Sequence, residues 1–226
     1  MELNFRAPIG RAPLRARDNS RSIAPHLFLI PDTNWAFVHI TKTGGSSFRH
    51  SFQMLRPVHS PNPKHLSKKE IRLSLEASEF SALRFVSIVR NPFTRFRSYC
   101  HYRAKRLNTT PDLTWFAQEV ERERLENKAR FGHVSSSQAD WLMGPSGDIE
   151  MDALLRFESF KQELDTFSQH IGLGHVMSVE TPHRIRSHYT QGIEEEFTPE
   201  IVAFVREYYR EDFEVFGDDL AFPPQA

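Results

Sequence analysis

The segment that most constrains the fold of this chain is residues 37–47, Phe-Val-His-Ile-Thr-Lys-Thr-Gly-Gly-Ser-Ser, where an apolar run breaks into a loop of lysine, glycine and hydroxyl residues. A helical pattern follows, with Phe48, Phe52 and Leu55 on one face. A strand that ends in paired glycines lets backbone N–H groups close around an anion, and the next helix adds its N–H groups and the positive end of its dipole. The segment therefore predicts a phosphate-binding loop between a buried strand and a helix.

Lys42 brings a mobile positive charge to this loop, but the loop is not a Walker A motif. That motif places its lysine after the last glycine, whereas Lys42 precedes both Gly44 and Gly45. The order argues against a nucleotide kinase. Taken alone, the segment is equally compatible with an ordinary strand-to-helix turn.

A second strand-to-helix element spans residues 84–99, Arg-Phe-Val-Ser-Ile-Val-Arg-Asn-Pro-Phe-Thr-Arg-Phe-Arg-Ser-Tyr. Asn91 is suited to cap the helix and Pro92 to occupy its first position. Arg90 ends the strand and Ser98 falls on the second helical turn, so a guanidinium and a hydroxyl are expected to form a second anion site. Two such sites on successive turns suit a ligand with two separated anionic groups.

Strands and helices alternate along the rest of the chain. This order predicts an α/β fold with a central parallel β-sheet flanked by helices. No Gly/Ser linker divides the 226 residues, so we expect an irregular Arg-rich arm at 1–24 and one domain at 25–226. The predicted strands are 27–30, 35–40, 84–90 and 151–157. The predicted helices lie near 68–75, from 92 onward with a basic end at 103–106, near 112–130, 136–143 and 160–171, and from 199 onward.

The composition excludes several classes of protein. Lys+Arg and Asp+Glu both number 29, so no global charge favours a nucleic acid. A single cysteine, Cys100, excludes a disulfide framework within the chain. No run approaches the ~20 apolar residues of a membrane span, and no signal-peptide core is present, so we expect a soluble, cytoplasmic protein. The arm is interpreted either as a contact with a second subunit of a homodimer or an acidic acceptor, or as a solvated tail.

With its two motifs the chain resembles the sulfotransferases that use 3′-phosphoadenosine 5′-phosphosulfate (PAPS), and more narrowly their carbohydrate (heparan-type) branch and its small bacterial relatives. The likeness covers roughly residues 35–217 and implies a P-loop-like fold. It extends in order and spacing to four later segments, 138–142, 155–158, 181–183 and 208–217.

The resemblance implies a role for each motif. The first loop would hold the 5′-phosphosulfate and the second element, through Arg90 and Ser98, the 3′-phosphate. Two residues depart from the family pattern, Thr41 in place of proline and Ser46 in place of threonine, and both keep a compact loop. Arg95 is interpreted as a structural ion-pair partner and not as a ligand contact. The residues implied to contact the phosphosulfate are Lys42, Thr43, Gly44, Gly45, Ser46 and Ser47.

Sulfuryl transfer moves a neutral SO₃ unit in line from a phosphate to an acceptor hydroxyl. The protein must align two oxygens and neutralise the charge that grows on the leaving phosphate, a role that suits Lys42. The transferred group carries less charge than a phosphoryl group, and no Cys/His set has zinc-ligand spacing, so no metal is expected. The products would be the sulfated acceptor and adenosine 3′,5′-bisphosphate (PAP).

The acceptor hydroxyl needs a base, and the chain has 11 histidines. A histidine suits the task because its pKa lies near neutrality. His65, between the two motifs, is the first candidate, since the resemblance implies a catalytic histidine there. His133 is the second and His59 the third, while His39 is interpreted as a strand-end residue that shapes the loop.

The expected function is a sulfotransferase that acts on a carbohydrate or another small hydroxyl acceptor. Two alternatives are kept. One is a P-loop-type nucleotide kinase, which would need Mg²⁺ and ATP. The other is a non-catalytic nucleotide-binding module of the same fold.

Overall fold

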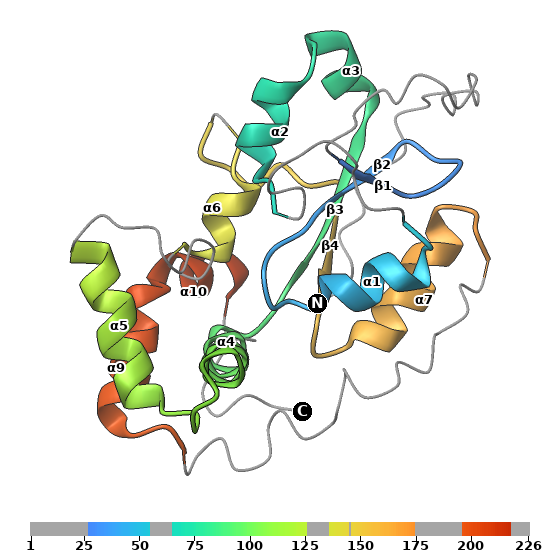
Figure 1. Cartoon of the computed structure of the whole chain (residues 1–226). Coiled ribbons are helices and arrows are strands. Elements are labelled where there is room, and N and C mark those ends of the chain that lie inside the picture. Colours follow the sequence, from blue (N-terminus) through green and yellow to red (C-terminus); the bar gives the residue numbers. More distant parts are fainter. Residues whose placement is uncertain (1–26, 55–64, 126–135, 145, 175–195, 218–226) are drawn as a thin grey trace. The chain divides into compact units, whose positions relative to one another are not determined.

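The computed structural model describes residues 27–54, 65–125, 136–144, 146–174 and 196–217, and these contain a sheet with the strand order β1-β2-β3-β4 (Figure 1). β2, β3 and β4 are parallel, and β1 lies antiparallel to β2 at the edge. The predicted α/β fold with a largely parallel sheet is confirmed. The predicted arm at 1–24 lies outside the described residues. The strands are β1 (Phe28–Leu29), β2 (Trp35–Val38), β3 (Arg84–Val89) and β4 (Ala153–Arg156).

Each helix predicted from the sequence is present in the described residues, although residues 126–130 of the helix predicted at 112–130 lie outside them. Two short helices, α3 and α10, were not predicted. α3 is too short to show a helical period, and α10 follows α9 almost without a break. No helix in the described part of the chain is long and apolar enough to cross a bilayer. The helices are α1 (Gly45–Ser51), α2 (Lys68–Ser74), α3 (Ala77–Ala82), α4 (Pro92–Leu107), α5 (Leu113–Leu125), α6 (Gln138–Leu142), α7 (Phe160–His170), α9 (Pro199–Tyr208) and α10 (Arg210–Phe216).

The chain divides into two compact units, neither of which is continuous in sequence. The first contains the sheet and helices α1, α2, α3 and α7. The second contains the short segment Thr41–Thr43, the first residues of α6, and helices α4, α5, α9 and α10. The prediction of one domain for residues 25–226 stays a prediction.

In the first unit, α1 and α7 cover one face of the sheet. Trp35 and Phe37 of β2 point to this face, because residues two apart on a strand share a side. The Trp35 ring contacts Phe167 of α7 with centroids 5.1 Å apart, and the Phe37 ring contacts Phe48 of α1 at 4.5 Å. Figure 1 shows these two helices side by side. The predicted packing of the helix after the first loop on the sheet is confirmed.

α2 and α3 cover the opposite face. Phe85 of β3 pairs with Ala36 of β2 and therefore points away from the α1 side. Its ring contacts Phe80 of α3, with centroids 5.0 Å apart, and lies 5.3 Å from Nζ of Lys68 in α2. The sheet is thus flanked by helices on both faces, as predicted.

The second unit has its own aromatic core. Phe96 of α4 contacts Phe116 of α5 with ring centroids 4.9 Å apart. Cys100 is buried beside them, and its thiol donates to the carbonyl of Asp112 at 3.3 Å. Burial raises the pKa of this thiol to about 11. The core residues are Phe93, Phe96, Tyr99, Cys100, Leu113, Phe116, Ala117, Val120, Phe197, Ile201, Val205 and Tyr209.

Candidate functional site

The loop between β2 and α1 carries two residues with positive φ, Lys42 (68°) and Gly44 (92°). Gly44 precedes α1, and its carbonyl accepts hydrogen bonds from the N–H groups of Ser47 at 2.9 Å and Phe48 at 3.2 Å. A Cβ on Gly44 would lie 2.7 Å from the Phe157 ring. The positive φ and the close ring both favour glycine at this position. The glycine therefore allows the tight turn that a phosphate loop requires.

Two buried arginines in the second unit hold the backbone of this loop. Nη1 of Arg90 donates to the carbonyl of Lys42 at 3.1 Å, and Nε of Arg95 donates to the carbonyl of Thr41 at 3.2 Å. The two arginines are only 2% and 1% exposed. They place positive charge next to the backbone of residues 41 and 42, which favours an anionic ligand there. Arg95 was predicted to be a structural ion-pair partner, and the contact described here is a hydrogen bond to a backbone carbonyl. The contact of Arg90 with the loop was not predicted.

A buried amide and a buried carboxylate fix the backbone of Arg90. Gln138 accepts from the N–H of Arg90 at 2.8 Å and donates to its carbonyl at 2.7 Å and to Asp212 at 2.9 Å. Asp212 also accepts from the N–H of Ala139 at 2.9 Å. Burial raises the pKa of the Asp212 carboxyl, and the Arg95 guanidinium partly opposes this change. Sequence reasoning missed this network because its members lie far apart in the chain.

Thr94 is a further residue that sequence reasoning missed. Its Oγ1 accepts from Nε of Arg90 at 2.8 Å and donates to the carbonyl of Asn91 at 3.1 Å. The Asn91 side chain accepts from the N–H of Phe93 at 2.9 Å, and Pro92 opens α4, so the predicted helix start is confirmed. The available signal was the four-residue spacing of Arg90 and Thr94 across that start.

Lys42 and Ser98 both lie near Tyr102 of α4 in the second unit. Nζ of Lys42 is 4.7 Å from the centroid of the Tyr102 ring. Ser98 is buried one helical turn before Tyr102, on the same side of α4. The second unit therefore contains four of the residues predicted to bind the nucleotide, Lys42, Thr43, Arg90 and Ser98. The residues 44–47 of the predicted loop belong to the first unit.

His65 lies in the first unit, where it contacts two other aromatic residues. Its Nδ1 is 2.9 Å from the carbonyl oxygen of His39, and the two imidazole centroids are 4.5 Å apart. The Trp141 ring stands perpendicular to His65 at 6.5 Å. His133 and His59, the other candidates for the base, lie outside the described residues. The choice among the three stays a prediction.

The described residues contain no group of three or more His, Cys, Asp or Glu side chains arranged to hold a metal ion. We therefore assign no metal ligand within the described ranges.

The mostly parallel sheet and the glycine-containing strand-to-helix loop define a P-loop-like α/β protein. A family model described as the sulfotransferase family matches residues 25–218, and the chain belongs to this family. The match covers most of the chain and supports sulfuryl transfer as its general chemistry. No curated protein and no solved structure matches the chain. The predicted sulfotransferase class is confirmed, while the carbohydrate branch stays a prediction.

Proposed function

We propose that the protein transfers a sulfuryl group from PAPS to a hydroxyl of a carbohydrate or another small acceptor. Family membership supports the reaction class. The observation that carries the proposal is the pair of buried arginines, Arg90 and Arg95, that donate to the carbonyls of Lys42 and Thr41. These bonds hold the backbone at Thr41 and Lys42, and the ammonium group of Lys42 is the one that the proposed chemistry needs.

Each motif has a proposed binding role. Arg90 and Ser98 bind the 3′-phosphate of the nucleotide, as the spacing of the second element predicts. The proposed ligands of the 5′-phosphosulfate are Lys42, Thr43, Gly44, Gly45, Ser46 and Ser47.

In the proposed reaction, an S–O bond to the acceptor forms as the S–O bond to the donor phosphate breaks. The acceptor proton passes to a histidine, for which His65 is the first candidate and His133 the second. Lys42 neutralises the charge that develops on the leaving phosphate, and PAP is released. The residues named here supply positioning and charge, and the proposal needs no metal ion.

The test is transfer of labelled sulfate from PAPS to a panel of hydroxyl acceptors, with and without EDTA. We expect a sulfated product and PAP in equal amounts, with no loss of rate in EDTA. Phosphoryl transfer from ATP that needs Mg²⁺ would instead identify a nucleotide kinase. Binding of PAP without turnover on any acceptor would identify a non-catalytic module.

A thermal shift measurement tests the proposed 3′-phosphate site without an acceptor. PAP at about 100 times its dissociation constant should stabilise the fold by roughly 2.7 kcal/mol, and AMP should stabilise it less. Ser98→Ala should reduce the difference between the two nucleotides, while Ser81→Ala, on the exposed surface of α3, is the matched control. Equal shifts from PAP and AMP would exclude a site for the 3′-phosphate.

A further inference from the structure

The hydrogen bond between His65 and His39 determines which nitrogen of His65 carries a proton. Nδ1 of His65 lies 2.9 Å from the backbone carbonyl oxygen of His39. A carbonyl oxygen only accepts hydrogen bonds, so Nδ1 must donate. A neutral imidazole has one N–H group, and Nε2 of His65 is then the nitrogen with a lone pair.

The imidazole ring of His39 is itself closely packed between neighbouring residues. Its ring stacks on Phe37, with centroids 5.4 Å apart, and lies 4.5 Å from the His65 ring. A Cβ added to Gly45, the first residue of α1, would lie 2.1 Å from Cδ2 of His39. The absence of a side chain at Gly45 therefore makes room for the His39 ring between β2, α1 and His65.

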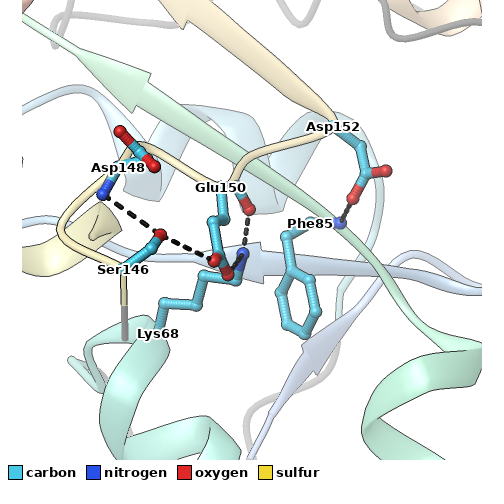
Figure 2. Close-up of polar contacts among 6 residues, drawn as sticks. All are labelled: Lys68, Phe85, Ser146, Asp148, Glu150 and Asp152. Atoms are coloured by element: carbon cyan, nitrogen blue, oxygen red, sulfur yellow. Dashed lines mark hydrogen bonds and ion pairs between the residues drawn. The ribbon is translucent and has the colours of Figure 1, made fainter. Parts of the chain in front are cut away.

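The chain that follows His65 is anchored as well. Ser67 caps α2 with a reciprocal pair of hydrogen bonds to Glu70. Lys68, the first residue of α2, is buried and donates to the carbonyl of Glu150, and its Nζ lies 3.3 Å from the Glu150 carboxylate. Figure 2 shows this pair together with Ser146, which also donates to Glu150. The backbone is therefore held at Lys68, three residues after His65.

We propose that His39 is a positioning residue for His65. Its carbonyl sets the tautomer that leaves Nε2 of His65 as the proton acceptor, and its ring fixes the orientation of the His65 ring. This inference rests on the proposed function, in which His65 accepts the proton of the acceptor hydroxyl. An orienting group that fixes the tautomer of a histidine base is a general requirement of such catalysis.

The tautomer is measured directly by NMR. Long-range ¹H–¹⁵N correlation spectra of the ¹⁵N-labelled full chain, at a pH roughly two units above the ordinary histidine value of about 6.5, report which ring nitrogen is protonated. His65→Ala identifies the signals of His65 by their loss. We expect the Nδ1-protonated tautomer to predominate. Predominance of the Nε2-protonated tautomer, which a solvated histidine favours, would overturn the proposal.

This measurement separates the inference from the proposed function, because it needs neither donor nor acceptor. If no acceptor is sulfated but the Nδ1-protonated tautomer is found, the proposed function fails and the geometry of His65 stands. If sulfate is transferred but the other tautomer is found, the proposed function stands and the positioning role fails.

Two variants of His39 test the role of its ring. Both keep the backbone carbonyl, but His39→Ala removes the ring that supports His65, so kcat should fall about 10-fold with little change in the KM for PAPS. His39→Phe keeps an aromatic ring against Phe37 and His65 and should restore most of this loss. Equal losses in both variants, or no loss in either, would contradict a positioning role. If neither variant folds, the NMR result on the unaltered chain decides.

Discussion

Lys42 combines a strained backbone with the chemical role proposed for its ammonium group. A non-glycine residue at positive φ is disfavoured by roughly 1 kcal/mol or more, and Lys42 has a φ of 68°. The hydrogen bond from Arg90 to its carbonyl helps to hold this conformation. A glycine could adopt this φ without strain. The presence of a lysine instead agrees with a need for its ammonium group.

We expect Lys42→Ala to fold normally and to lose most sulfate transfer. A group that stabilises charge in the transition state is worth roughly 10²- to 10³-fold in kcat. Steady-state transfer rates and PAP binding are to be compared with those of Lys105→Ala, which removes an exposed lysine near the end of α4. If Lys42→Ala transfers sulfate at the parent rate, Lys42 has no part in the reaction.

Arg95 is expected to act on stability. Its guanidinium donates to the carbonyls of Thr41 and Ser136 and lies 5.6 Å from the centroid of the Tyr209 ring. Arg95→Met removes these donors from a buried position and should destabilise the fold by about 3 kcal/mol, since each hydrogen bond from a charged group contributes about 1.5–3 kcal/mol.

Chemical denaturation measures this change. Arg210→Ala is the matched control, because its side chain is 64% exposed and its loss should change the free energy of unfolding by less than about 0.5 kcal/mol. A similar small change in both variants would show that Arg95 does not hold the loop.

At the scale of single elements, an ion pair joins α4 to Glu196, which lies three residues before the first residue of α9. Arg97 of α4 donates twice to the carboxylate of Glu196, and His101 lies 3.4 Å from the same carboxylate. The hydrogen bond from Arg97 lowers the pKa of Glu196 below its usual value of 4.5. This pair therefore stabilises the fold above about pH 4.5 and loses its effect as the pH falls through the lowered pKa.

Glu196→Gln should accordingly lower the melting temperature at pH 7 and should have a smaller effect near pH 3. The measurement is the difference in melting temperature between parent and variant across this range. Glu207→Gln, in the exposed pair with Arg210, is the control and should change little at either pH. An effect of Glu196→Gln that grows toward low pH would contradict the assigned direction.

The elements that the sequence predicted well are those with local signals. Asn91 and Pro92 mark the start of α4 through chemistry confined to neighbouring residues, and Gly44 and Gly45 mark the first loop in the same way. The contact of Asp212 with Gln138 has no such signal, because the two residues lie far apart in the sequence and only the folded chain brings the carboxylate to its donor. The roles of the residues predicted to bind the nucleotide stay predictions, because each role is a contact with the nucleotide.

At the scale of the whole molecule, the two units each have a core built around aromatic rings. Phe167 is fully buried against the sheet of the first unit, and Phe116 is fully buried in the second. The chain passes between the units several times, since Thr41–Thr43 belong to the second while the flanking residues belong to the first. Neither unit is a continuous segment that could fold before the other is complete.

We therefore expect the protein to unfold in one transition. Phe116→Ala and Phe167→Ala should each destabilise it by about 3–5 kcal/mol, the usual cost of a large cavity, and each should shift the whole transition. Far-UV circular dichroism and tryptophan fluorescence are the two probes. Two separate transitions, with each variant shifting only one, would show that the units unfold independently.

Because Cys100 is buried in the core of the second unit, the reaction of its thiol can measure how often that core opens. Cys100 is the chain's single cysteine, and it is 1% exposed. The pKa of its thiol is about 11, so at neutral pH the thiol is protonated as well as inaccessible to a disulfide reagent. Labelling of the native chain must then wait for fluctuations that expose the aromatic core of the second unit. The labelling rate counts these fluctuations without any engineered probe, and a nucleotide that binds the folded state should slow it.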